Sequence, residues 1–314
     1  MLFRSGPVRS VDLGQFALST GGFSVQNDGA LRLKIHPDRV DIDKLALVSG
    51  EARLSASGRL TPENAEGLKI VLSSLSLSRF DRFFPESLPV EGLAEARAVL
   101  TGTLGAPRIE ADVRVVDGRI GEVAFSEMTA AALPEKDGVR IDAALVGAAG
   151  QRAAIQGTVP VRFSLSPAAA DWTAGRFDLR FSLGQWRLDE LPYAEEIATR
   201  IEGAITVSGR LSGTPAAPAA ALDAVVSDGR FTVPESSGER IGFSRLALEA
   251  GLENGRATVR AAMTKQERSV AALSAELPVT FSLKPLKFEP GKDGLDARLL
   301  SERSEERRVG KECA

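Results

Sequence analysis

The sequence predicts an all-β fold, an elongated antiparallel meander of repeated hairpins. Three observations carry this prediction: short runs in which apolar and polar residues alternate, tight-turn sequences between the runs, and an internal repeat of about 110 residues. Apolar residues make up 43% of the chain and aromatic residues only 5%, so aliphatic side chains dominate. Such a composition suits many half-buried strands better than one thick core.

Alternation begins early and continues to the end of the repeat. In the run Leu31–Ile35, the apolar residues Leu31, Leu33 and Ile35 are separated by Arg32 and Lys34. Residues 140–145, 176–183 and 279–284 follow the same pattern. A period of two places one apolar and one polar face on each strand.

Asn-Gly and Asp-Gly sequences separate many of the alternating runs. These pairs supply the positive φ angles that tight hairpin turns require. We therefore expect antiparallel neighbouring strands on either side of each one. The turn sequences are Asn27-Asp28-Gly29, Asp117-Gly118, Asp137-Gly138, Asp228-Gly229 and Asn254-Gly255.

Three segments depart from the alternation. Residues 78–85 and 189–198 favour one or two short connecting helices, each limited by proline. Residues 296–314 end in a highly charged stretch, which predicts a disordered tail. This tail is foreign to the repeat and resembles read-through sequence rather than native sequence.

The internal repeat defines the expected domains. Residues 107–120 align with residues 218–231 without a gap, and Phe125-Ser126 corresponds to Phe243-Ser244. Pro160 and the strand after it correspond to Pro278 and its strand. The expected organisation is the end of a preceding β-repeat (1–90), one β-repeat module (91–200), a second module (201–295) and the tail (296–314).

Charge and hydropathy exclude several functional classes. The net charge of −3 arises from 39 basic and 42 acidic residues that are scattered along the chain, which disfavours nucleic-acid binding. No apolar run reaches the ~18 residues of a transmembrane helix, and the first residues lack the apolar region of a signal peptide. We expect any anchoring or targeting segment to lie outside this chain.

The catalytic inventory is nearly empty, which predicts that the chain is not an enzyme and carries no cofactor or metal. His36 is the only histidine and is expected to face solvent from a strand. Cys313 is the only cysteine, so neither a disulfide nor a cysteine metal site can form. Asp41 and Asp43 share one strand face without further ligands, which indicates solvated surface. No nucleophile or phosphate-binding motif is present.

The apolar face is the remaining candidate for function. A meander can cover this face by folding into a sandwich or barrel, or can curl into a trough for an apolar ligand. The leading hypothesis is a trough that holds an apolar ligand. The alternative is a structural β-repeat scaffold or secreted passenger with a self-covered core. The expected groove-lining residues are Leu31, Leu33, Ile35, Val113, Val115, Phe163, Leu165, Phe177, Leu179, Phe181, Val225, Val259, Phe281 and Leu283.

Gly209–Pro218, the alternating strand that follows and Asp228-Gly229-Arg230 together resemble the repeats of the TamB family. Gly102–Arg119 matches with a shorter turn, and residues 40–50 resemble the broader AsmA-like group. The likeness covers residues 10–290.

The TamB family comprises the inner-membrane subunits of the translocation and assembly module. The resemblance implies a long β-sheet, with one or two short connecting helices, that is curled into an open hydrophobic groove in which phospholipid acyl chains lie against aliphatic side chains. It implies a periplasmic segment of a cell-envelope protein anchored in the inner membrane. It also implies outer-membrane protein assembly or phospholipid transport between membranes, with an outer-membrane barrel partner bound through regions outside this chain. No catalytic residues are carried over.

Overall fold

The computed structural model describes residues 9–20, 23–36, 39–61, 63–79, 89–165, 167–172, 175–188, 201–232, 240–284, 286–291 and 295–301. Within these ranges the chain forms β-strands and no α-helix, and the strands pair in antiparallel fashion. The predicted all-β antiparallel meander is therefore confirmed. The chain divides into two compact units, one of residues 1–184 with 211–215 and one of residues 185–210 with 216–314.

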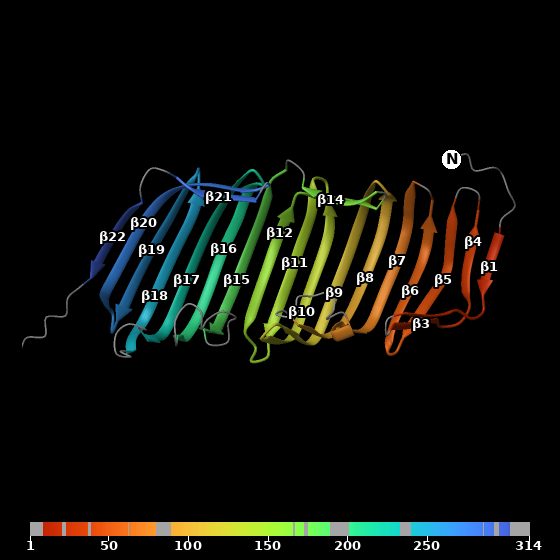
Figure 1. Ribbon diagram of the computed structural model, residues 1–314, viewed down its shortest axis with the longest axis horizontal. Coiled ribbons are helices and arrows are strands. Elements are labelled where there is room, and N and C mark those ends of the chain that lie inside the picture. The colour runs from red at the N-terminus through yellow and green to blue at the C-terminus, as the bar shows by residue number, and fades with distance from the viewer. Residues whose placement is uncertain are drawn as a thin grey trace, which may run out of the picture. The chain divides into compact units, whose positions relative to one another are not determined.

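In the first unit, each strand from β4 to β11 pairs with the next one along the chain, as Figure 1 shows. β12 skips the following hairpin and pairs with β15. The strands are β1 (Arg9–Leu13), β2 (Ala17–Thr20), β3 (Phe23–Asn27), β4 (Leu31–Ile35), β5 (Val40–Ser49), β6 (Ala52–Leu60), β7 (Asn64–Ser76), β8 (Val90–Thr103), β9 (Ala106–Ile120), β10 (Val123–Glu135), β11 (Gly138–Gly147), β12 (Arg152–Val159), β13 (Val161–Leu165), β14 (Ala168–Trp172) and β15 (Phe177–Arg187), whose last residues belong to the second unit.

In the second unit, β17, β18, β19 and β20 form a meander in chain order. The long strand β20 has two partners on its other side. Its first half pairs with β22 and its second half with β21. The strands are β16 (Ile201–Thr214), β17 (Ala217–Thr232), β18 (Arg240–Glu253), β19 (Arg256–Lys265), β20 (Arg268–Leu283), β21 (Leu286–Pro290) and β22 (Asp296–Ser301).

The same order of elements occurs in both units, as the repeat predicts. β9, β10 and β11 correspond to β17, β18 and β19. β12 and β13 correspond together to β20, and the difference lies at the shared proline. Pro160 separates two strands, whereas Pro278 lies within one continuous strand. The crossing hairpin β13–β14 thus has its counterpart in the pairing of β20 with β21.

The hairpin β13–β14 crosses one end of the first sheet. The backbone N–H of Leu165 donates a hydrogen bond to the carbonyl of Leu104, in the turn between β8 and β9, at 2.7 Å. Figure 1 shows this hairpin running across the strand ends rather than along the strands. Val159 and Pro160, at the start of the crossing, are buried. The hairpin therefore covers one end of the sheet.

Two of the predicted Asp-Gly turns are wrong. Asp117-Gly118 lies inside β9 and Asp228-Gly229 lies inside β17. The backbone of both aspartates is in the left-handed region, with φ of 49° for Asp117 and 50° for Asp228. On β9 the pairing with β8 shifts register between Glu91 and Leu93, so these residues form a β-bulge. The positive φ that the sequence favours is present, but it bends a strand instead of ending one.

The other turn sequences have mixed outcomes. Asn254-Gly255 joins the paired strands β18 and β19 with φ of 51° and 74°, and Asp137 lies in the turn between β10 and β11, so these predictions are confirmed. Gly29 ends β3 with φ of 81°, yet β3 and β4 are not paired with each other there. Both pair with β5.

A hydrophobic cluster lies at each bulge. In the first unit, Ala94, Val115 and Phe125 are buried together, with Leu77 and Met128 packed against them. In the second unit, Leu188, Val226 and Phe243 form the matching cluster. The ring of Phe231 packs against that of Phe243 at 6.2 Å between centroids. In the first unit the cluster lies opposite the crossing hairpin, because the hairpin contacts the turn before β9 whereas the bulge lies near the other end of β9.

Two further expectations need comment. Residues 296–301 were expected in a disordered tail but form β22, because Leu273 and Ala275 of β20 offer apolar partners to Leu299 and Ala297. Residues 302–314 lie outside the described residues. So do residues 189–198 and most of 78–85, where helices were expected; residues 77–79 form a 3₁₀ turn.

Candidate functional site

Cross-strand partners in the first unit assemble one continuous apolar face. Antiparallel partners point their side chains to the same side of a sheet. Val113 of β9 pairs with Ala96 and with Ala130, and Ala130 pairs with Ala143. The row continues across β11, β12 and β15 through Ala143, Ile155 and Phe181. We call this side of the sheet the apolar face.

The apolar face also contains most of the lining residues predicted for the first unit. Leu33 pairs with Ile42 and Ile35 with Val40, which extends the face to β4 and β5. Val113 and Val115 lie on β9, and Leu179 and Phe181 lie on β15. The predicted residues that the register brings to this face are Leu31, Leu33, Ile35, Val113, Val115, Phe177, Leu179 and Phe181.

Phe163 and Leu165 occupy a different place from the one expected. Both lie on β13 in the two-stranded crossing hairpin, not on the main sheet. Their side chains are exposed, at 38% and 43%. Proline removes the backbone donor at Pro160 and separates β13 from β12, so the chain changes direction before Phe163.

In the second unit, the predicted residues Val225 and Val259 lie on opposite faces. Val259 pairs with Ala250 and Ala275, which belong to the apolar side. Val225 pairs with Ala247 and alternates with the buried Ala224 and Val226, so it points to the polar side. A slip of one residue exchanges the faces of a strand. The gapless repeat aligns Val226 with Val115, and so indicates that Val226, not Val225, faces the apolar side.

Phe281 and Leu283 lie at the end of β20, where the strand pairs with β21. Both are half-buried, and the neighbouring Val279 is only 4% exposed. They belong to the second unit's counterpart of the crossing hairpin. These two residues therefore cover the end of a sheet rather than line its middle.

Burial along the apolar face differs between its ends and its middle. Phe125 at one end is 3% exposed and Phe177 at the other is 2% exposed. Between them, Ile155 is 38% exposed although it lies mid-strand with paired strands on both sides. The second unit shows the same contrast, because Leu273 at the position equivalent to Ile155 is also 38% exposed. Each sheet leaves aliphatic side chains accessible mid-strand.

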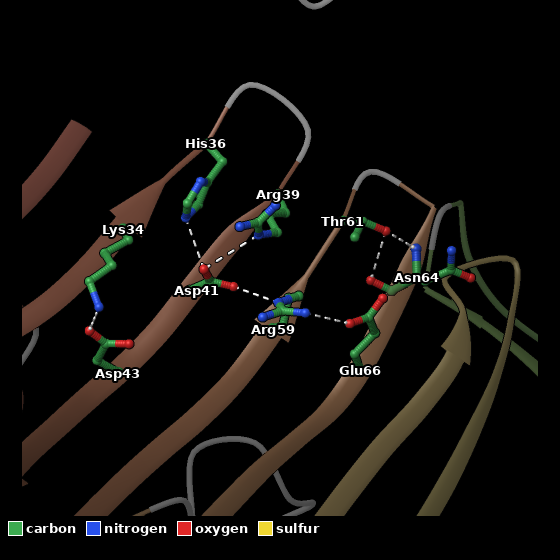
Figure 2. A network of polar contacts seen from close by, with 9 residues as sticks. All are labelled: Lys34, His36, Arg39, Asp41, Asp43, Arg59, Thr61, Asn64 and Glu66. Atoms are coloured by element: carbon green, nitrogen blue, oxygen red, sulfur yellow. Dashed lines mark hydrogen bonds and ion pairs between the residues drawn. The ribbon is translucent and has the colours of Figure 1, made fainter. Parts of the chain in front are cut away.

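The opposite face carries paired charges. Figure 2 shows the most connected group, in which Asp41 lies beside three basic side chains. Its carboxylate accepts hydrogen bonds from Arg59 Nε at 2.7 Å and Arg39 Nε at 3.4 Å. Arg59 also contacts Glu66 at 3.2 Å. The hydrogen bond from Arg59 holds the pKa of the Asp41 carboxyl below its ordinary range, opposed by partial burial.

His36 was expected to face solvent, and the structure corrects this. Its side chain is 14% exposed, and Nε2 lies 2.9 Å from Oδ2 of Asp41. The backbone N–H of His36 donates to the carbonyl of Arg39, so the end of β4 is held beside the start of β5 and the ring lies next to the carboxylate. Asp43 behaves as expected, since it pairs with Lys34 at an exposed position.

The acidic and basic side chains of this polar group pair with one another. Asp41 is engaged by His36, Arg39 and Arg59, and no cluster of potential metal ligands occurs within the described ranges. In the same ranges, no helix has the length and hydropathy to cross a bilayer. The apolar face thus remains the candidate site.

No protein-family model matches this chain, and neither a curated protein nor a solved structure does.

Proposed function

We propose that the apolar face binds lipid acyl chains, and that the chain is a segment of a TamB-like cell-envelope protein. The observation that carries the proposal is the exposed aliphatic surface mid-strand, centred on Ile155 and flanked by the buried residues Phe125 and Phe177. An acyl chain laid across this surface removes apolar area from water on both sides, at about 25 cal/mol per Å². Each buried methylene would contribute about 0.8 kcal/mol.

Charge placement supports a role in which headgroups stay away from this face. Within the described residues, no buried polar or charged side chain is present, and ion pairs such as Arg114 with Glu127 lie on the other side of the sheet. A ligand on the apolar face would therefore meet apolar side chains such as Ile155 and Phe181. This favours an acyl chain over a polar ligand, for which unmatched polar groups would be costly to desolvate.

The wider role follows from the TamB-like pattern in the sequence. It comprises a periplasmic location, an inner-membrane anchor, and outer-membrane protein assembly or phospholipid movement between membranes. The proposal includes an outer-membrane barrel as a partner. It also includes the absence of catalysis, so lipid movement would proceed by binding alone.

Neighbouring residues of β12 allow a matched test. Ile155 points to the apolar face and Ala154 to the polar face, where it pairs with Ala144 and Ser182. A photo-crosslinking side chain at position 155 should label phospholipid in vesicles or cell extracts, and the same group at position 154 should label at least about tenfold less. Native mass spectrometry of the unmodified chain should show bound phospholipid, and Ile155→Glu should abolish it, since a buried unpaired charge is costly.

The alternative is a scaffold whose apolar face binds nothing. The buried clusters around Phe125 and Phe243 support this alternative, because in them the chain's own side chains cover part of the apolar face. A chain that stays lipid-free with added phospholipid, together with equal labelling from positions 154 and 155, would establish the scaffold and refute the acyl-chain proposal.

A further inference from the structure

The strand β22 has the most exposed apolar residues of the described chain. Leu295, just before it, is 62% exposed, and within it Leu299 and Leu300 are 69% and 72% exposed. In the portion that the structure describes, β22 pairs with β20 alone. One edge of β22 therefore presents backbone N–H and C=O groups beside bare leucine side chains, which is the usual template for the addition of a strand.

The repeat identifies the type of strand that fits this edge. β22 follows the hairpin of the second unit as β15 follows the hairpin of the first. Leu299 pairs with Leu273 as Phe181 pairs with Ile155. β22 is thus equivalent to β15.

β15 is in turn equivalent to β7. Each carries a residue with a left-handed backbone at the matching place, Gln185 with φ of 52° and Ser74 with φ of 54°. Each of these is followed by an apolar residue at the sheet end, Trp186 or Leu75, of which Trp186 is buried and Leu75 packs on the Phe125 cluster. The three strands therefore occupy one position of the module.

In the first unit, the edge of β7 that corresponds to the free edge of β22 is covered by β8. Ile70 pairs with Ala98, and Leu68 pairs with Leu100. β8 alternates small or aliphatic residues on the apolar face with charged residues such as Arg97 on the other. β8 is therefore an example of a strand that pairs with this edge of the module.

We infer that the free edge of β22 binds an extended segment of the β8 type by antiparallel strand addition. Transfer of the β7–β8 register places Leu299 opposite an alanine equivalent to Ala98. It places Ala297 opposite a leucine equivalent to Leu100. Main-chain hydrogen bonds hold such a segment, and alternate apolar side chains select it. The inference concerns an edge rather than the apolar face and stands apart from the acyl-chain proposal.

The test uses the full chain and a synthetic peptide of residues 90–103, the β8 sequence. Amide hydrogen exchange of residues 296–301 should slow at least about tenfold at saturating peptide, since added ladder hydrogen bonds protect those amides. A scrambled peptide of the same composition should give no protection. The exchange of β19, which is not at the edge, should not change and serves as the internal reference.

Two modified peptides make the test specific for pairing. Backbone N–H groups of successive strand residues point to opposite edges. One peptide is N-methylated at alternate residues on one edge, and the second at alternate residues on the other. One of them should lose binding at least about tenfold and the other should retain it.

Four results would overturn the inference. Equal protection by the scrambled peptide would show non-specific apolar contact, and binding of both methylated peptides would show that the ladder is not formed. Protection of residues 296–301 that rises with protein concentration in the absence of peptide would assign the edge to a second copy of the chain. A peptide that gives no protection at any soluble concentration would leave the edge without the proposed occupant.

Discussion

Asp41 and Asp43 show how two similar residues acquire different environments. They lie two positions apart on β5, and the sequence predicts solvated surface for both. Asp43 is 41% exposed and pairs with Lys34. Asp41 is 18% exposed, because β6 brings Arg59 alongside and the turn after β4 brings His36 and Arg39 over it. Only strand pairing and turn geometry produce this difference.

The lowered pKa of Asp41 gives a pH-dependent prediction. A carboxyl whose pKa is depressed by folding stabilises the native state above its unfolded pKa, and the contribution is lost as pH falls through the folded pKa. The stability difference between the native chain and Asp41→Asn should therefore be complete at pH 7. It should shrink as pH falls below the ordinary aspartate pKa of about 3.9.

Urea unfolding at several pH values measures this difference. Asp43→Asn is the matched control, because Asp43 pairs with Lys34 at an exposed position where solvent screens the ion pair. A difference for Asp41→Asn that is independent of pH between 7 and 3 would contradict the electrostatic role assigned to Asp41.

At the scale of elements, the bulge of β9 joins three strands. Gly118 lies under the ring of Phe125 from β10, and a Cβ at Gly118 would overlap that ring. Gly92 of β8, with φ of 129°, approaches the same point, since a Cβ there would lie 3.0 Å from the Cα of Gly118. The second unit repeats the arrangement with Gly203, Gly229 and Phe243. The shared Asp-Gly and Phe-Ser pairs of the repeat are thus parts of one packing device.

Gly118→Ala tests this device. The added methyl must displace the Phe125 ring from the cluster, and we expect a loss of roughly 1–3 kcal/mol in the free energy of unfolding, as for overpacked cores. Gly105→Ala is the control, because a Cβ there meets nothing within 4 Å. Chemical denaturation of both variants compares them. Equal and small effects would show that the ring does not pack on Gly118 in solution.

At the scale of the whole molecule, each unit has its own cluster. The cluster around Phe125 is built from residues of the first unit, and that around Phe243 from residues of the second. Repeat proteins stabilise themselves largely through local contacts within repeats and between neighbours. We therefore expect damage to one cluster to remain mainly within its own unit.

Phe125→Ala and Phe243→Ala make this expectation measurable. Each removes a buried ring, which costs about 3–5 kcal/mol in a core. Hydrogen exchange should accelerate in β8–β11 for the first variant and in β17–β19 for the second. Reciprocal patterns of this kind support local cooperativity. Uniform acceleration of the whole chain by either variant would show that the two units unfold as one.

The fold class, the antiparallel order and the repeat were predictable from the sequence alone. Alternation with a period of two is a local property, so the faces of Leu31–Ile35 and of Phe177–Phe181 were predictable without tertiary contacts. The empty catalytic inventory can also be read directly from residue types. The face of Val225 was predicted wrongly, although the alignment of Val226 with Val115 contains the signal needed to correct it.

Two features depend on tertiary structure: whether the repeated Asp-Gly pairs form turns or bulges, and which apolar residues stay accessible. An Asp-Gly pair favours a left-handed backbone both in a hairpin turn and in a bulge, and only the neighbouring strand and the Phe125 ring select the bulge. Alternation likewise predicts that Ile155 and Phe177 share a face, but not that one is 38% exposed and the other 2%. That contrast depends on packing at the ends of the sheet, and it defines the surface proposed to bind acyl chains.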